Sequence, residues 1–301
     1  MDIRLSFFQI ITQVIVFFWN RGDMKMWKSK HIFIHDYVLI EEFLKNDLLP
    51  FLDLLEKEYF FIRYWDGGPH IRLRYRDHSE GDKFDEKLEE LVYSFKNRHK
   101  EHEFGEILYN KAIIETEKIT PDRLYPNFSI QNIEYIPELQ RYGGEVAIGF
   151  SEDLFVNSSK MASEIIRKFE HRHRYLMAID LIYGSAEIAK KIGYFDEEKQ
   201  FFLAYREVWK QFSNRDKIES VDVAIANRVN KIRQGVLNLG FYQNYFNAFE
   251  EAIKAIKIRQ TVILPEYIHF IIISHLHMLN NRLGIAPEQE YIFSNAILQI
   301  C

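Results

Sequence analysis

The spacing of hydrophobic residues changes along this chain of 301 residues, and the change falls at Gly143-Gly144. Before this pair, short runs of alternating or continuous apolar residues predict strands, with a few helical segments between them. After it, apolar residues recur at helical spacing in eight segments, of which the first two are residues 145–155 and 160–172. Because strands and helices are segregated, the sequence predicts an α+β fold. An antiparallel sheet in a β-rich part (27–144) is expected to pack on a helical part (145–300).

The composition limits the chemistry that the chain can carry. Its one cysteine is Cys301, so an intramolecular disulfide and a cysteine-based metal site are excluded, and a reducing, cytoplasmic location is expected. The 39 Lys and Arg residues against 44 Asp and Glu residues give a net charge of -5, the wrong sign for binding nucleic acid through the overall field. No pair of histidines has a recognisable metal-ligand spacing, and no glycine-rich phosphate-binding motif occurs. The sequence therefore predicts no metal and no direct contact with nucleic acid.

The most apolar segment is Leu5–Trp19, whose fifteen residues fall short of the roughly 20 needed to cross a bilayer. No small-residue cleavage site follows it, so it does not fit a secretory signal. We expect residues 1–23 to be a mis-started extension, with translation beginning at Met24 or Met26 and a single domain from there to the C-terminus at residue 301. The reason is that the last three residues of the extension can be encoded by a purine-rich run that resembles a ribosome-binding site. The alternative is an amphipathic helix that docks on the rest of the protein.

The segment His70–Arg76 is the first candidate for a functional site. Strand alternation places its apolar residues on one face and its basic residues on the other, namely His70, Arg72, Arg74 and Arg76. Neighbouring arginines on that face start about 7 Å apart and repel each other by roughly 2 kcal/mol at an effective dielectric of 20. A solvated edge strand tolerates this repulsion, whereas an enclosed face needs an anion, either a fixed carboxylate or an anionic ligand. Alternation alone leaves both interpretations open.

Arg63 and Arg141 add two further cations to the candidate site. Arg63 lies on the preceding strand, and pairing of the two strands across a Gly-Gly turn is expected to bring it near Arg72 and Arg74. Arg141 stands two residues before Gly143-Gly144, where a tight turn ahead of a helix gathers free N–H groups that favour anions. The alternative for Arg141 is a loop with an ordinary surface arginine.

A third candidate segment lies late in an apolar helix that is expected to end at Gly284. His277 and Asn281 are four residues apart and share a helix face, and Arg282 lies a little further round. His277 is either a buried core residue with its hydrogen bonds satisfied or a group that transfers protons. The helix alone does not distinguish these roles.

Together and in this order, the three segments resemble the C-terminal elimination domain of lantibiotic dehydratases, also described as the thiopeptide-type bacteriocin biosynthesis domain. The similarity covers roughly residues 27–300. The matching stretches are Phe60–Arg74, Glu138 with Arg141-Tyr142-Gly143-Gly144, and His277-Met278 with Asn281-Arg282-Leu283.

The resemblance implies an activity and a set of site residues. In the family's elimination reaction, a Ser or Thr of a precursor peptide carries glutamate as an ester, and the domain expels glutamate to leave dehydroalanine or dehydrobutyrine. The implied catalytic residues are Arg72, Arg74 and Arg141, which bind the glutamyl group and stabilise negative charge, and His277, which takes part in proton transfer. Substrate-binding roles are implied for Arg63, His70, Asn281 and Arg282. No cofactor is implied.

We rank elimination by the small subunit of a split dehydratase first, because the whole arginine and histidine set is present. The expected partners are the precursor peptide, with its leader and glutamylated core, and a glutamylation subunit that uses glutamyl-tRNA; a homodimer is also compatible. One alternative is an enzyme that closes the pyridine ring of a thiopeptide by aza-[4+2] cycloaddition. A second is a non-catalytic subunit that binds the precursor peptide.

Overall fold

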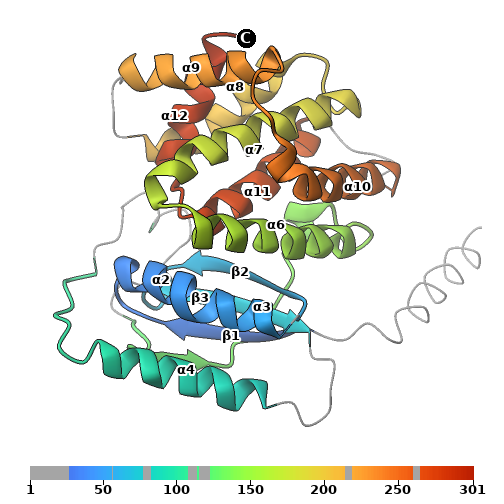
Figure 1. Cartoon of the computed structure of the whole chain (residues 1–301). Helices are drawn as coiled ribbons and strands as arrows, with labels where there is room; N and C mark the ends of the chain where they lie inside the picture. The colour runs from blue at the N-terminus through green and yellow to red at the C-terminus, as the bar shows by residue number, and fades with distance from the viewer. Residues whose placement is uncertain are drawn as a thin grey trace, which may run out of the picture.

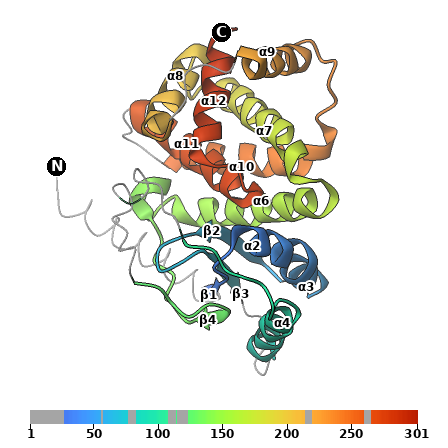
Figure 2. The same cartoon turned by 90° about the vertical axis from the view of Figure 1, so that its left-hand side faces the viewer.

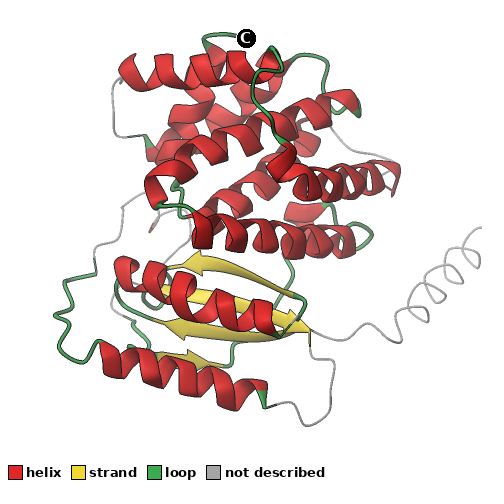
Figure 3. Cartoon of the chain, viewed as in Figure 1, coloured by secondary structure: helices red, strands yellow, loops and turns green. Residues whose placement is uncertain are grey.

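The structure is a computed structural model that describes residues 27–55, 57–76, 83–107, 114, 123–213, 219–259 and 265–301 (Figure 1). The expectation for residues 1–23 falls outside these ranges. The N-terminal part of the described chain forms a sheet layer, and the C-terminal part forms a stack of helices (Figure 3). The predicted α+β class is therefore confirmed. None of the described helices is long and apolar enough to cross a membrane.

Four antiparallel strands form the sheet of the described residues, in the order β2-β3-β1-β4. They are β1 (Trp27–Phe33), β2 (Tyr59–Tyr64), β3 (His70–Arg76) and β4 (Ser129–Gln131). In an antiparallel pair, directly opposed residues share a face. The face that carries the basic residues of β3 is called the arginine face below; it comprises His70, Arg72, Arg74 and Arg76 with their β1 partners Phe33, His31, Ser29 and Trp27.

Helices cover the other face of the sheet. A continuous helical segment comprises α2 (Tyr37–Phe43), the π-helical turn η1 (Leu44–Leu48) and α3 (Leu49–Leu54), and α4 (Phe84–Arg98) lies beside it (Figure 2). The π turn ends two residues before Pro50, which cannot donate a backbone hydrogen bond and crowds the turn before it. Widening that turn lets the helix continue along the sheet.

The helical layer begins with α6, which lies between the sheet and the remaining helices in both views (Figures 1 and 2). Its long helices are α6 (Ile148–Lys168), α7 (His171–Lys191), α8 (Glu198–Trp209), α9 (Glu219–Arg233), α10 (Gln243–Arg259), α11 (Pro265–Leu283) and α12 (Pro287–Leu298). The short 3-10 turns are η2 (Leu139–Tyr142), η3 (Lys210–Phe212) and η4 (Gly240–Tyr242).

Helix α6 corrects one expectation, because residues 145–155 and 160–172 were predicted as two helices and most of both lies in one. The polar residues between them suggest a break, but they bond back to the preceding turn. Asn157 Nδ2 donates to the carbonyl of Asp153 (2.9 Å), and Ser158 Oγ donates to the carbonyl of Phe155 (3.1 Å). Such bonds are compatible with a continuous helix.

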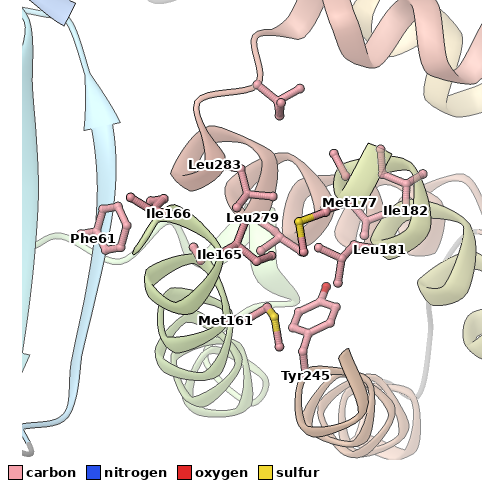
Figure 4. Close-up of a cluster of buried hydrophobic side chains, with 14 of the residues drawn as sticks. Phe61, Met161, Ile165, Ile166, Met177, Leu181, Ile182, Tyr245, Leu279 and Leu283 are labelled. Atoms are coloured by element: carbon pink, nitrogen blue, oxygen red, sulfur yellow. The ribbon is translucent and has the colours of Figure 1, made fainter. Parts of the chain in front are cut away.

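One large hydrophobic cluster joins the sheet layer to the helices (Figure 4). Phe61 of β2 meets α6, and beyond it lie buried side chains that include Ile165, Ile166, Met177, Leu181, Leu279 and Leu283. A smaller cluster around Phe60, Tyr142 and Phe155 covers the arginine face. That face is therefore enclosed, and the interpretation of His70–Arg76 as a solvated edge is wrong.

Candidate active site

Side chains from α6 and α11 close the edge strand β2. The N–H of Phe61 donates to Ser159 Oγ (3.2 Å). Two residues further on, the N–H of Arg63 donates to Asn281 Oδ1 (2.8 Å), and Asn281 Nδ2 donates to the carbonyl of Arg63 (2.9 Å). An amide can satisfy both backbone groups of an edge residue in this way, much as another strand would. Asn281 therefore holds α11 against the sheet, next to the arginine face.

Arg63 does not lie where strand pairing was expected to place it. It is opposite Ile71 in the register, so its side chain projects from the face away from the arginine face, and the expected approach to that face is wrong. Its guanidinium instead lies 2.7 Å from Glu41 Oε2, while the other oxygen of Glu41 contacts Arg174 at 2.5 Å. Arg63 Nε also donates to the carbonyl of Arg282 (3.2 Å). Arg63 thus joins α11, α2 and α7.

His70 holds Arg72 in place on the arginine face. His70 is fully buried; its Nδ1–H donates to the carbonyl of Gly68 (2.8 Å), and its Nε2 accepts from Arg72 Nε (3.3 Å). The Arg72 guanidinium lies 3.4 Å from the centre of the Tyr64 ring. Burial lowers the pKa of His70 to about 3, and the nearby arginines add to this effect. His31 stacks on His70 with ring centres 4.9 Å apart, and burial lowers its pKa to about 2, so both rings are neutral.

Arg74 is the most enclosed cation of β3, with 6% of its surface exposed. Burial lowers its pKa to about 9, and the charge of Arg72 contributes, so Arg74 stays protonated at neutral pH. Its Nε and Nη1 have no hydrogen-bond partner in the described part of the chain, and its guanidinium lies 5.5 Å from the centre of the Tyr135 ring. Burying a cation with unpaired N–H groups is unfavourable unless an anion binds. Arg74 is therefore a candidate for binding an anion.

Arg282 brings a second buried cation to the same place from α11. It is 1% exposed, and its Nε donates to Ser159 Oγ (2.9 Å), while Nη1 has no partner among the residues described. Burial lowers the pKa of Arg282 to about 10, and Arg282 in turn helps to lower the pKa of Arg74. Nearby His275 is neutral because burial, followed by the charges of Arg282 and Arg141, lowers its pKa to about 3.

Arg141 approaches from η2, as the Gly143-Gly144 turn allows. Both glycines have left-handed backbone, with φ of 89° and 81°, a conformation that favours glycine. Arg141 Nη1 donates to Glu138 Oε2 (3.2 Å), and Nε donates to Ser274 Oγ of α11 (3.3 Å). The bond to Ser274 holds η2 beside α11, and the bond to Glu138 orients the Arg141 guanidinium within η2.

The structure gathers the three predicted catalytic arginines and one predicted binding residue. We call this group the arginine cluster, and it is composed of Arg72, Arg74, Arg141 and Arg282. The carboxylates near it are Glu138 and Glu152, which bonds the phenol of Tyr135. The neighbouring histidines are neutral, so the cluster has an excess of positive charge. It can bind carboxylates and stabilise negative charge that develops during a reaction.

The structure does not bring His277 into contact with the arginine cluster. Its Nδ1 lies 2.6 Å from Glu290 Oε1, and its ring lies 4.3 Å from that of Trp209. Residues three apart in an α-helix are almost one turn apart along the axis and differ by about 60° in direction around it. His277 therefore lies nearly one turn beyond Ser274 on α11 and points toward α8 and α12, which carry Trp209 and Glu290. Helix α11 meets the arginine cluster through Arg282, which belongs to both, and through the Ser274 hydroxyl, which bonds Arg141.

Three residues with roles in this arrangement were not predicted from the sequence. Tyr135 lies six residues before Arg141 and could have been found as an aromatic ring close to a predicted arginine site. Glu290 is an acidic residue within an apolar helix, a pattern that indicates a buried partner. Ser159 gives no comparable signal. Among the described residues, no group of three or more His, Cys, Asp or Glu side chains could hold a metal ion.

The fold and the site define an α+β protein in which an enclosed arginine cluster lies on one face of the sheet, and a neighbouring helix carries a histidine paired with a glutamate. The chain matches the family described as "Lantibiotic biosynthesis dehydratase C-term" over residues 27–300, and it belongs to this family, as its motifs predicted. It is 28% identical over 171 residues to the subtilin biosynthesis protein SpaB of Bacillus subtilis. The match covers 56% of this chain and 13% of SpaB.

Solved structures share the fold at low sequence identity. The tRNA-dependent lantibiotic dehydratase MibB from Microbispora sp. 107891 superposes with a TM-score of 0.54 and 18% identity, over 90% of this chain and 28% of MibB. The pyridine synthase TbtD from thiomuracin biosynthesis gives 0.56 and 14%, over 91% of this chain and 96% of TbtD. TsrL gives 0.58 and 12%, over 91% and 95%. Because a dehydratase and a pyridine synthase share this fold, the choice of reaction depends on the side chains.

Proposed function

We propose that this chain eliminates glutamate from glutamylated Ser or Thr residues of a ribosomal precursor peptide. The observation that carries the proposal is that Arg74 and Arg282 are buried together with unpaired N–H groups. A glutamyl ester brings one free carboxylate and releases a second one when it leaves. Guanidinium groups bind carboxylates through paired N–H donors, so the arginine cluster suits both the bound ester and the departing glutamate.

The reaction breaks the Cα–H and Cβ–O bonds of the esterified residue and forms a Cα=Cβ double bond. The proton passes to a base, and glutamate leaves with the electron pair of the Cβ–O bond as a carboxylate. Negative charge develops on the carbonyl oxygen of the modified residue before the leaving group departs, and fixed cations stabilise it. In the proposal, Arg72, Arg74 and Arg141 bind the glutamyl group and stabilise this charge, and Arg282 helps to bind the ester. His70 keeps Arg72 oriented through the bond to Arg72 Nε.

His277 is the proposed proton-transfer group. The carboxylate of Glu290 accepts a hydrogen bond from Nδ1–H, which keeps the proton on Nδ1 and leaves Nε2 as the basic nitrogen. Nε2 has no hydrogen-bond partner among the described residues, and 7% of the surface of His277 is exposed. In this proposal the base acts from the α11 side of the arginine cluster, one helical turn from the Ser274 hydroxyl that bonds Arg141.

The ester itself is proposed to come from a separate glutamylation protein that uses glutamyl-tRNA. This chain spans 28% of the dehydratase MibB, and the proposal assigns ester formation to the part that this chain does not match. A pyridine-forming cyclase and a non-catalytic peptide-binding subunit are the two alternatives. The cyclase would form a different product, and the peptide-binding subunit would form none.

The test is to incubate the purified chain with a precursor peptide that is already glutamylated and to follow the peptide by mass spectrometry. Elimination releases free glutamate and leaves dehydroalanine or dehydrobutyrine. An unchanged glutamyl adduct overturns the proposal. A parallel incubation with a peptide that already contains dehydroalanines detects ring closure, which would favour the cyclase, and binding without any chemical change would favour the peptide-binding subunit.

A further inference from the structure

Strand β1 contributes polar side chains to the arginine face. Of its residues, only His31, which stacks on His70, has been discussed so far. Trp27, Ser29 and His31 occupy alternate positions of β1, so all three point to this face. Each has a buried polar atom that lacks a hydrogen-bond partner in the described part of the chain: Trp27 Nε1, Ser29 Oγ and His31 Nε2. Buried polar atoms of native proteins are nearly always paired. Three unpaired atoms at successive inward positions of one strand therefore indicate a missing polar group.

The unpaired atoms of β1 face those of Arg74. Ser29 is directly opposite Arg74 in the register, and such pairs have Cβ atoms about 4.5–5.5 Å apart. Trp27 and His31 are the diagonal neighbours of Arg74 on the same face. The Ser29 hydroxyl and the unpaired Nε and Nη1 of Arg74 thus border the same space, and the centre of the Tyr135 ring lies 5.5 Å from the Arg74 guanidinium.

The chemistry of this space favours an anion. Arg74 offers two N–H donors, Ser29 offers a hydroxyl, and the neutral imidazole of His31 can donate from Nε2. A ligand ammonium would be repelled by Arg74 and by Arg72, which is opposite His31. A carboxylate accepts up to about four hydrogen bonds and matches a guanidinium with further donors beside it.

We propose that Ser29 and His31, together with Arg74, form the site for the side-chain carboxylate of the glutamyl group and make the enzyme selective for glutamate. This inference rests on the proposed function. An aminoacyl-tRNA carries its amino acid through the α-carboxyl group, so the ester that it supplies keeps its side-chain carboxylate free. A site that hydrogen-bonds a polar group strongly disfavours an analogue that lacks this group, because its own donors are then left unpaired. Strand β1 thereby distinguishes a glutamyl ester from an acetyl ester.

The test compares Ser29→Ala and His31→Phe with the control Ser129→Ala. Phenylalanine can keep the stacking of His31 on His70, and Ser129 belongs to the same sheet but donates its hydroxyl to the carbonyl of Pro126 (2.6 Å). The substrates are one peptide that carries either a glutamyl or an acetyl ester on the same serine. Each β1 variant should lower kcat/KM for the glutamyl ester about tenfold or more and leave kcat/KM for the acetyl ester unchanged. The preference for the glutamyl ester over the acetyl ester should therefore decrease. The control should behave as wild type. An unchanged preference, or an equal loss with both esters, overturns the inference.

A binding measurement separates this inference from the proposed function. In a peptide where diaminopropionate replaces the serine, the glutamyl group is attached through a stable amide, and calorimetry measures its affinity without turnover. If wild type eliminates glutamate but Ser29→Ala and His31→Phe bind the amide as tightly as wild type, only the carboxylate site is refuted. If wild type does not eliminate glutamate, the proposed function fails. In that case, a tenfold loss of affinity for the amide in both variants still supports the carboxylate site, and affinities equal to that of wild type refute it.

Discussion

Nδ1 of His277 lies 2.6 Å from Oε1 of Glu290 in the interior of the helical layer. Glu290 is fully buried, and its other oxygen accepts hydrogen bonds from the Tyr205 hydroxyl (2.6 Å) and from Asn280 Nδ2 (3.0 Å). The ring of Trp209 packs on the imidazole from another side. The carboxylate is therefore a fixed acceptor, and it determines both the orientation of the imidazole and the nitrogen that carries the proton.

Replacing Glu290 with glutamine tests whether this pairing serves the reaction. A glutamine can donate to Nδ1 and thereby move the imidazole proton to Nε2, which removes the basic nitrogen. We expect Glu290→Gln to slow glutamate elimination by roughly 10²-fold or more, with little change in KM, in single-turnover assays on a glutamylated peptide. Glu250→Gln is the control, since Glu250 pairs with Lys254 on the surface of α10 and should behave as wild type. A wild-type rate for Glu290→Gln would remove His277 from the proposed proton transfer.

Arg74 is expected to lower the stability of the fold and to be required for activity. Methionine has a similar length, needs no hydrogen bonds and relieves the burial of an unpaired cation. We expect Arg74→Met to abolish elimination while the free energy of unfolding, measured in urea, stays equal or rises by about 1–4 kcal/mol. The comparison is Arg228→Met, which leaves the buried carboxylate of Asp180 without the two bonds of 2.6 Å that Arg228 donates, and should cost about 3–5 kcal/mol. A similar loss of stability in Arg74→Met would show that Arg74 is satisfied within the fold.

Strand alternation was sufficient to place the basic residues of His70–Arg76 on one face, and the register confirms this. It could not place Arg63, because a shift of one residue in the pairing moves a side chain to the other face. The register depends on the connection between β2 and β3, where Gly67 and Gly68 have φ of 81° and 107° and Tyr64 becomes the partner of His70. Those backbone angles result from packing against neighbouring residues, which local sequence patterns do not contain.

The same limit applies to α11. Helical periodicity gives the angle between Ser274 and His277, but it does not show which of them turns to the sheet. Helix α11 is apolar on most of its surface and packs against β2 and α6 on one side and α8 on another. Its orientation is determined by tertiary contacts such as the bonds of Asn281 to the backbone of Arg63.

Asn281 is expected to contribute to stability through those two bonds. Asn281→Ala leaves the N–H and the carbonyl of Arg63 without their partner at the edge of the sheet, which should lower the free energy of unfolding by about 1–3 kcal/mol. The amide of Arg63 should also exchange its hydrogen faster than in wild type, because its protecting acceptor is gone. Urea unfolding and hydrogen exchange measure the two effects. Unchanged exchange at Arg63 would contradict the observed pairing.

Buried neutral histidines predict that the protein loses stability in mild acid. The pKa values of His31, His70 and His275 are lowered to about 2, 3 and 3, from 6.5 in an exposed histidine. Between those values and about pH 6.5 the unfolded chain binds protons that the folded chain excludes. The stabilisation from these groups is therefore complete above about pH 6.5 and is lost as the pH falls. Each histidine contributes a slope of about 1.4 kcal/mol per pH unit near pH 5.

His275→Phe tests this dependence, since phenylalanine can fill the space between Tyr142 and Phe155 and does not titrate. Urea unfolding at a series of pH values from 7.5 to about 5 gives the slope of the free energy of unfolding. The variant should lower that slope by about 1.4 kcal/mol per pH unit near pH 5, because one fewer proton is taken up on unfolding. His173→Phe is the control, because His173 is exposed and should leave the slope unchanged. Equal slopes for His275→Phe and wild type would mean that His275 takes up its proton without unfolding of the chain.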